Sequence, residues 1–99
     1  MAFVRVGEFK ARPGTTDQLR RVYETEAIPA IRSAPGNVSA VLMQQREAPE
    51  TFMAITIWST EGDAEAYDQS GQAVEMVGKI RFAFAGPPTL TTYEAFGLR

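Results

Sequence analysis

The sequence has no histidine and no cysteine among its 99 residues. These two side chains are the ones that most often exchange protons near neutral pH, bind transition metals or act as strong nucleophiles. Their absence excludes catalysis by an imidazole base or a thiolate, and it excludes metal sites built on those ligands. Any chemistry must therefore come from carboxylates, Lys, Arg, Tyr, the single Trp, backbone groups or shape.

Long hydrophobic runs and an excess of positive charge are also missing. The apolar runs are only a few residues long, so we expect no membrane span, and Arg5, Glu8 and Lys10 interrupt the first one, which excludes a signal peptide. The 12 acidic and 10 basic residues give a net charge of −2, which creates no basic field to attract nucleic acid. We therefore expect a cytoplasmic protein that binds neither nucleic acid nor membrane, in keeping with its lack of cysteine.

The chain has the size and composition of one small folded domain. It is 44% hydrophobic and 22% charged, as is ordinary for a soluble folded protein. A domain of this size buries somewhat over ~60% of the surface that its unfolded chain exposes, which leaves one modest core. We therefore expect residues 1–99 to form a single domain, for which dimerisation is a natural way to bury more surface.

Hydrophobic patterning predicts the element order β-α-β-β-α-β. Apolar, β-branched and aromatic residues alternate in four segments that are bounded by turn-forming residues. The expected strands are residues 2–11, 38–46, 51–58 and 89–96. This order is that of the ferredoxin-like α+β fold, in which a four-stranded antiparallel sheet carries its helices on one face.

The first helical region follows the turn at residues 12–14. Thr15 and Gln18 fit a capping box at its start. Apolar residues then recur with the helical period up to Ile31. Pro29 removes one helical hydrogen bond and crowds the preceding turn, so it predicts a kink or break near residues 25–28.

The second helical region is expected in two pieces. Thr60 with Asp63 is an N-cap signal, and a short helix should cover residues 63–69. Ser70 and Gly71 interrupt the pattern. A second apolar stripe then predicts a helix over residues 72–84.

Both faces of the predicted sheet are apolar. In the third strand, Phe52, Ala54, Thr56 and Trp58 share one face, and Met53, Ile55 and Ile57 share the other. A sheet face in contact with water normally alternates with polar residues, and helices cover only one face of this fold. No loop in the sequence is long enough to cover the second face. We therefore expect two copies of the chain to pack sheet against sheet as a symmetric homodimer.

Several of these features occur together in one known family. The first helix ends in IPAIRSAPG (28–36), a hairpin follows, the third strand ends at Trp58, and an acidic short helix carries Tyr67. In this arrangement, over nearly its whole length, the chain resembles the antibiotic biosynthesis monooxygenase (ABM) superfamily of dimeric α/β barrels. The resemblance implies a homodimer whose sheets face each other and a pocket between the sheet and helices of each protomer. It also implies activities that include cofactor-independent oxidation of quinols or polyketide-type aromatics, and haem degradation.

The residues that haem-degrading members use are changed in this chain. Tyr67 falls where those members carry a second Trp in the short helix, and their haem-ligating His aligns near Met76 or Val77. Where they use an Asn near the end of the first strand, this chain has Gly7 and Glu8. An imidazole is the usual axial ligand in such a site, so the sequence favours the oxygenase members.

The resemblance implies catalytic roles for three residues. Trp58 matches a Trp commonly found at the end of the third strand and would stack on a planar substrate. Tyr67 would donate a hydrogen bond to a substrate oxygen, and Arg81 would stabilise its negative charge. Phe9 and Met43 are further candidates for the lining of the substrate pocket. A structural role is the alternative for each residue, as core packing or, for Arg81, as a helix-dipole partner.

We therefore expect a cofactor-independent monooxygenase-like protein that acts on a small planar aromatic or quinol-type substrate, with neither metal nor flavin. The acidic cluster Glu61, Asp63 and Glu65 is interpreted as helix capping and not as a metal site. Two other hypotheses remain open. One is a non-catalytic small-molecule-binding or assembly dimer of the same fold, which the lack of an obvious proton acceptor favours. The other is an isomerase or lyase that uses a carboxylate such as Glu8 as its base.

Overall fold

A computed structural model describes residues 1–98 of the chain. The strands are β1 (Ala2–Lys10), β2 (Asn37–Gln44), β3 (Thr51–Trp58) and β4 (Thr89–Ala95). The helices are α1 (Thr16–Val22), α2 (Ile28–Arg32), α3 (Glu61–Gln69) and α4 (Gln72–Ile80), with a π-helical turn at Tyr23–Ala27 and a 3-10 turn at Arg81–Ala83. Over residues 1–98, no helix combines the length and the apolar composition needed to cross a membrane.

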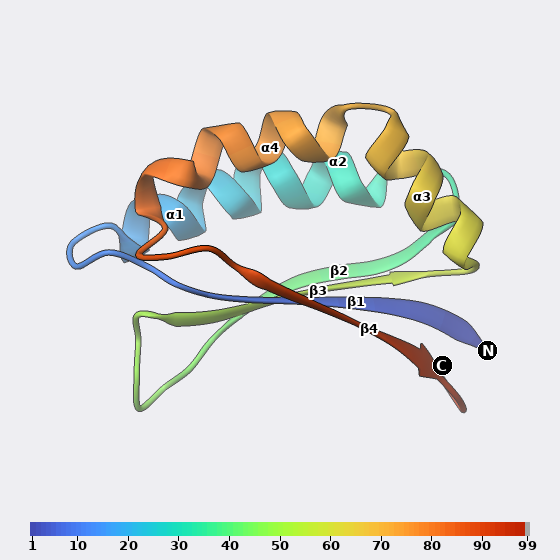
Figure 1. Ribbon diagram of the computed structural model, residues 1–99, viewed down its shortest axis with the longest axis horizontal. Coiled ribbons are helices and arrows are strands. Elements are labelled where there is room, and N and C mark those ends of the chain that lie inside the picture. The colour runs from blue at the N-terminus through green and yellow to red at the C-terminus, as the bar shows by residue number, and fades with distance from the viewer. Residues whose placement is uncertain (99) are drawn as a thin grey trace.

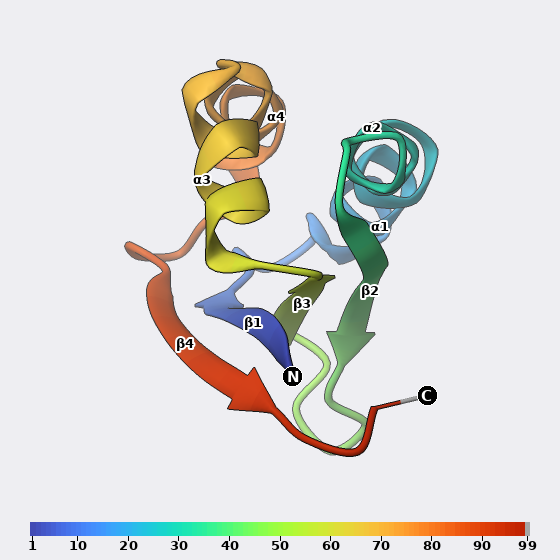
Figure 2. The ribbon, with the colours of Figure 1, turned by 90° about the vertical axis from the view of Figure 1, so that its right-hand side faces the viewer.

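The four strands form one sheet in the order β2-β3-β1-β4, and each neighbouring pair is antiparallel. The helices lie on one face of this sheet in two rows, α1 with α2 and α3 with α4 (Figures 1 and 2). The register places Phe3 opposite Trp58 and Gly7 opposite Ala54 in β1 and β3. The predicted ferredoxin-like α+β fold is therefore confirmed.

The predicted capping box at Thr15 and Gln18 is wrong. Helix α1 begins at Thr16, and the Thr15 hydroxyl donates to the Arg12 carbonyl oxygen at 2.7 Å instead of accepting from a helical amide. The backbone at Thr15 has φ −108° and ψ −4°, whereas an N-cap residue normally takes extended angles that aim its oxygen at the helix. The tight turn that follows β1 imposes this conformation, since the Thr15 amide also donates to the Arg12 carbonyl.

The expected break before Pro29 is a π-helical turn. The Ile28 amide donates to the Tyr23 carbonyl oxygen, five residues earlier. Pro29 has no amide hydrogen, and its ring crowds the carbonyl group four residues before it. A wider turn relieves that crowding, so the chain continues into α2 without stopping.

The second helical region forms in two pieces as predicted, although α4 ends at Ile80 and a 3-10 turn takes the place of the last part of the predicted helix over residues 72–84. The Thr60 hydroxyl oxygen accepts a hydrogen bond from the Asp63 amide at 3.1 Å, which confirms the N-cap of α3. Gly71 has φ 85°, in the left-handed region that favours glycine, and it separates α3 from α4. This separation lets α3 lie over the end of the sheet at which β3 terminates (Figure 1).

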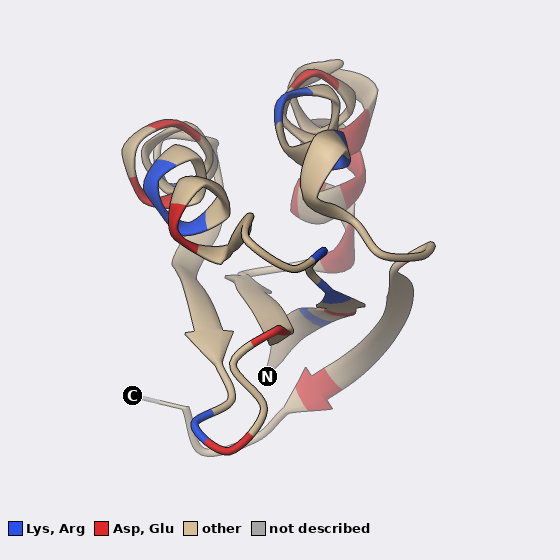
Figure 3. Cartoon of the chain, turned by 90° about the vertical axis from the view of Figure 1, so that its left-hand side faces the viewer, with Lys and Arg blue, Asp and Glu red and all other residues tan. Residues whose placement is uncertain are grey.

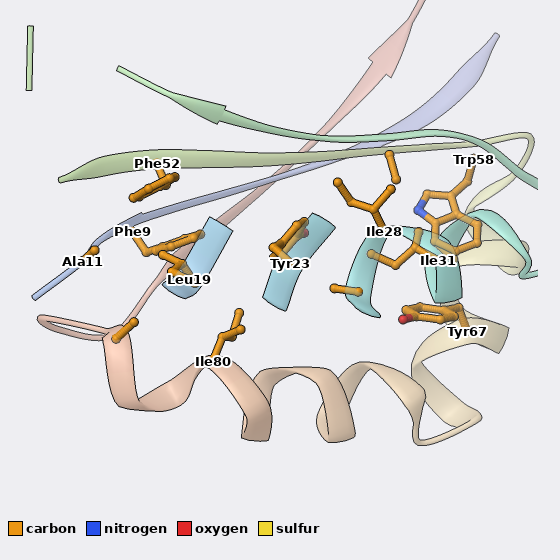
Figure 4. Close-up of a cluster of buried hydrophobic side chains, with 14 residues drawn as sticks. Phe9, Ala11, Leu19, Tyr23, Ile28, Ile31, Phe52, Trp58, Tyr67 and Ile80 are labelled. Carbon is orange, nitrogen blue, oxygen red and sulfur yellow. The ribbon is translucent and has the colours of Figure 1, made fainter. Parts of the chain in front are cut away.

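The core fills the layer between the sheet and the two helical rows. Its largest fully buried side chains are those of Trp58, Phe52 and Leu19. Phe9 stacks on Phe52 with their ring centroids 5.6 Å apart, at the opposite end of the layer from Trp58 (Figure 4). Tyr23 lies between these two ends. The core is therefore a flat aromatic layer with polar-tipped rings in its middle and at one end.

The sheet face opposite the helices is apolar and only partly covered. Ile55 and Ile57 of β3 are half-buried on this face, and Val41 of β2 and Tyr93 of β4 are exposed beside them. Figure 3 shows most charged residues on the helices and the β2–β3 turn, and β2 and β3 carry none. The prediction that both faces are apolar is confirmed.

Candidate functional site

Trp58 and Tyr67 lie against each other between the end of β3 and helix α3. Their ring centroids are 5.4 Å apart, and both side chains are buried. The Trp58 indole N–H donates to the Thr56 hydroxyl oxygen at 3.0 Å, so the polar edge of the indole is satisfied from its own strand. The structure thus brings together two of the aromatic residues that the sequence analysis singled out.

The Tyr67 hydroxyl is buried and has no hydrogen-bond partner within residues 1–98. In Figure 4 it points along the core, toward the side on which Tyr23 lies. A buried hydroxyl nearly always finds a partner, because leaving it unpaired in an apolar layer costs about 1–3 kcal/mol. A buried polar atom without a partner in the protein is a place where a water molecule or a ligand atom can bind.

Burial keeps both tyrosines of the layer protonated. Burial raises the pKa of Tyr67 above its ordinary value, and the charge of Asp68 raises it further. Burial also raises the pKa of Tyr23 to about 12, with a further contribution from Tyr67. Both phenols therefore remain neutral at physiological pH and are available as hydrogen-bond donors.

Arg5 is a site residue that the sequence analysis missed. It lies on the helix-facing side of β1, directly across from Thr56, and its Nη1 donates to Asp68 Oδ1 at 2.7 Å. Its guanidinium carbon lies 5.8 Å from the centroid of the Phe3 ring. The strand alternation carried the signal, since Arg5 shares its face with Phe3 and Phe9. We refer to Arg5, Thr56, Trp58, Tyr67 and Asp68 as the inner cluster.

The two partners of the ion pair between Arg5 and Asp68 differ in their exposure to solvent. The Arg5 side chain is 17% exposed, whereas that of Asp68 is 48% exposed. Such a pair stabilises the fold by only about 0.2–1 kcal/mol, because water screens the exposed partner. The Nε of Arg5 is buried and has no acceptor in the described part of the chain. Asp68 therefore holds the Arg5 guanidinium in place, while the Arg5 Nε donor has no acceptor within residues 1–98.

A pocket of about 490 Å³ adjoins this end of the site. It lies between the end of β4 and the start of α3, and its lining includes Phe3, Thr92, Glu61 and Glu94. Thr92 lies directly across from Arg5 in the sheet. The two carboxylate-bearing residues give this pocket an acidic character.

The sheet surface next to Arg5 has room on its helix-facing side. Gly7 is the next residue of β1 on that face, and a Cβ added there would meet only the Ala54 carbonyl oxygen, at 4.0 Å. Leu90 of β4 lies directly across from Gly7, on the same face, and is 67% exposed. Gly7 is itself only half-buried, so no side chain of β1 fills the sheet surface next to Arg5.

A second pocket, of about 280 Å³, reaches Tyr67 from the helical side. It lies between the end of α2 and the junction of α3 with α4, where Pro35, Asp63 and Ser70 also line it. Of the inner cluster, Tyr67 lines this second pocket, and no member lines the 490 Å³ pocket.

The other predicted site residues lie elsewhere. Phe9 is buried at the opposite end of the core, where Phe52 and Phe84 pack on it. Met43 is half exposed on the outer sheet face, paired across the strands with Met53. Arg81 is exposed beyond the end of α4. The structure therefore brings Trp58 and Tyr67 together without these three residues.

The carboxylates that the sequence singled out do not reach the inner cluster. Glu8 is exposed on the outer sheet face, paired with Met53, so it cannot act as a base for a ligand on the helix side. Asp63 accepts from the Thr60 hydroxyl at 2.9 Å, as expected of a residue in a helix cap. Over residues 1–98, no group of three or more His, Cys, Asp or Glu is placed to hold a metal ion.

The residues at the haem-ligand positions do not fit that group. Met76 packs against the hydrophobic core, and Val77 is exposed on α4. Tyr67 is stacked against Trp58. A thioether held in the core and an exposed isopropyl group do not replace an imidazole as the axial ligand.

The sequence model of the family "Antibiotic biosynthesis monooxygenase" matches residues 2–79. The chain belongs to the antibiotic biosynthesis monooxygenase family. No curated protein matches its sequence.

Solved structures of family members share the fold at low sequence identity. A Bordetella bronchiseptica protein, provisionally described as an antibiotic biosynthesis monooxygenase, is 20% identical with a TM-score of 0.84, over 96% of this chain and 97% of its own. A Nitrosomonas europaea protein with the same provisional description is 16% identical with a TM-score of 0.88, over 97% and 91%. A single-site mutant of SnoaB, a cofactor-independent oxygenase from Streptomyces nogalater, is 15% identical with a TM-score of 0.84, over 95% and 92%. Similarity at these identities shows the fold and leaves the substrate open.

Proposed function

We propose that this protein is a cofactor-independent monooxygenase that oxidises a small planar aromatic or quinol-type substrate at the inner cluster. The observation that carries the proposal is the buried Tyr67 hydroxyl, which lies beside Trp58 and has no partner within residues 1–98. A phenolic or carbonyl oxygen of a substrate would supply that partner. Membership of the family supports an oxygenase, and SnoaB, which shares the fold, is described as a cofactor-independent one.

The chemistry assigned to the site needs no external reductant. A substrate methylene next to an aromatic ketone loses its proton to solvent, and the resulting anion gives one electron to O₂. The two radicals combine to a hydroperoxide, which loses water to leave a new carbonyl group. One CH₂ group and one O₂ thus become one C=O group and one H₂O, and the substrate supplies all the electrons.

The protein's part is to bind and stabilise the anion. Trp58 is fully buried and packs on Tyr67, so it holds that ring in position and does not itself offer a free face to a substrate. The neutral Tyr67 phenol donates to the anionic oxygen. Arg5 would stabilise the negative charge, and its ion pair with Asp68, which directly follows Tyr67 in α3, supports this role. Arg81 was the residue expected in that role, but it lies beyond the other end of α4.

Oxygen consumption with a panel of anthrones, naphthols and quinols tests this function. We expect uptake above the buffer rate for at least one class, with product gaining one oxygen atom and losing two hydrogens. Tyr67→Phe should lower kcat/KM by roughly 10²- to 10³-fold, the range for loss of one hydrogen-bond donor to a developing charge. Tyr93→Phe, on the outer sheet face, serves as the matched control. Ligand-induced thermal stabilisation without any turnover would instead identify a non-catalytic binding protein.

The functional unit in this proposal is a homodimer formed through the outer sheet faces. Val6, Ile55 and Ile57 cluster on this face, with Val41 and Tyr93 exposed beside them. Monomeric proteins rarely leave a contiguous apolar patch of more than a few hundred Å² in water. A second copy related by a two-fold axis presents the same apolar surface and covers this one.

A further inference from the structure

We propose that Arg5 sets the substrate class of the inner cluster: the aromatic ligand carries a carboxylate group that binds the Arg5 guanidinium. The inference rests on the proposed function for the aromatic nature of the ligand. Its independent basis is the burial and the incomplete hydrogen bonding of the Arg5 guanidinium. Arg5 is largely buried on the helix-facing side of the sheet, next to Tyr67's neighbour Asp68.

The guanidinium has hydrogen-bonding capacity that the protein leaves unused. Arginine has five N–H donors in a planar fork, and it binds a carboxylate best through two parallel hydrogen bonds. One Nη1 donor of Arg5 goes to Asp68, while the buried Nε finds no acceptor within residues 1–98. An anion that binds side-on to the guanidinium would satisfy this Nε and a second donor together.

The existing contact with Asp68 uses only one of the N–H donors of Arg5. The guanidinium lies near the Phe3 ring, and Asp68 holds it from α3 at 2.7 Å. Asp68 is about half exposed, so water stabilises its carboxylate when the ion pair opens. A ligand anion can therefore compete with Asp68 for Arg5 at little cost to the fold.

In this proposal the ligand lies over Gly7 and not in the 490 Å³ pocket. Above Gly7 a Cβ would meet only one atom within 4 Å, and Leu90 beside it is exposed. The 490 Å³ pocket, which Phe3 lines, also has Glu61 and Glu94 in its lining, and their carboxylates repel an anion. A planar ligand resting over Gly7 can place its anionic edge at Arg5.

Calorimetric titration with 2-naphthoate and its neutral amide, 2-naphthamide, tests the inference on the full chain. We expect wild type to bind the carboxylate at least roughly tenfold more tightly than the amide, as for a hydrogen-bonded charged group. Arg5→Met should remove that preference, weakening carboxylate binding roughly 10- to 100-fold while leaving amide binding unchanged. The exposed Arg46→Met is the matched control and should bind as wild type does.

A second variant distinguishes recognition from a merely structural ion pair. Asp68→Asn removes the internal competitor, so we expect about two- to five-fold tighter carboxylate binding. A structural pair predicts no gain in affinity from either variant. Thermal melting without ligand shows whether Arg5→Met folds. If it does not fold, the affinity of Asp68→Asn still decides the question, because Asp68 lies on a helix surface.

The outcomes separate the two proposals. If acid and amide bind equally well, or if Arg5→Met and Asp68→Asn both bind the acid as wild type does, the role of Arg5 is overturned and the aromatic site stands. If neither compound binds, this inference is overturned. The proposed function is overturned separately, if no anthrone, naphthol or quinol gives oxygen uptake above the buffer rate.

Discussion

The Ile28 amide donates to the carbonyl oxygen of Tyr23, five residues earlier, where an α-helix would use the residue four earlier. The extra residue in this turn lets Tyr23, Ala27, Ile28 and Ile31 all face the core. Pro29 is the local cause of the wider turn. Its structural consequence is that a tyrosine lies in the middle of an apolar layer, where burial, and to a smaller extent Tyr67, raise its pKa.

The burial of Tyr23 predicts a loss of stability at alkaline pH. Its pKa is about 12 in the folded protein, against 10.0 for an ordinary tyrosine, mainly because burial disfavours the phenolate and further because of Tyr67. The folded state then holds a proton that the unfolded state releases. Its contribution is fully present below about pH 10 and is lost as pH rises to about 12, by about 2–3 kcal/mol in total. Urea unfolding at a series of pH values measures this loss.

Two variants test whether Tyr23 causes this loss of stability at alkaline pH. Tyr23→Phe should remove most of the decline above pH 10, because the buried group can no longer ionise. Tyr93→Phe should leave the decline in place, since the buried Tyr23 phenol is still present. An equal slope in wild type and Tyr23→Phe would show that Tyr23 is not the titrating group.

Removing the Tyr67 hydroxyl should stabilise the free protein while impairing its function. The hydroxyl is buried without a partner in the described chain, so Tyr67→Phe relieves a desolvation cost and should raise the free energy of unfolding by about 1 kcal/mol. Thr56→Val is the opposite case, because it removes the acceptor of the Trp58 indole N–H and should cost about 1–3 kcal/mol. Denaturant unfolding compares them. A substantial destabilisation by Tyr67→Phe would show that the hydroxyl has a structural partner.

The sequence predicted most of the fold because its signals are local. Strand β3 has the predicted bounds Thr51–Trp58, and the Thr60 cap forms as expected, since both depend on residues within a few positions of each other. The failed capping box at Thr15 shows the limit of such signals. There the preceding turn fixes the backbone angles, and a matching pair of residue types does not override them.

The site was predicted less well because it depends on which strand face meets the helices. Alternation separates Met43 from Leu42, but only the register with β3 shows that Met43 faces away from Trp58. The same alternation placed Arg5 beside Phe3, yet its role depends on Asp68, which is 63 residues away in the chain. Contacts at that separation leave no pattern in a single sequence.

Gly36→Ala should be more destabilising than the same change at Gly14. Both glycines have φ 81°, so alanine at either site is strained by about 1–2 kcal/mol. At Gly36 the added Cβ would also overlap the Asp63 carboxylate, whereas nothing lies within 4 Å of the same position at Gly14. Moving Asp63 disturbs the α3 cap, which is worth about 1 kcal/mol more. Thermal or urea unfolding of the two variants measures the difference, and equal losses would mean that the cap does not depend on this contact.

A charge at the centre of the outer sheet face should separate the proposed dimer. Ile55 lies directly across from Val6 in β1 and Val41 in β2, so Ile55→Lys places an ammonium group in the middle of the apolar surface. Burying an unpaired charge against a second copy costs several kcal/mol, enough to convert a micromolar dimer into a monomer. Light scattering should report twice 10.9 kDa for wild type and 10.9 kDa for the variant. Val74→Lys, an exposed position on α4, should remain dimeric. A wild-type particle of the single-chain mass at micromolar concentration would rule out the dimer and leave the apolar face unexplained.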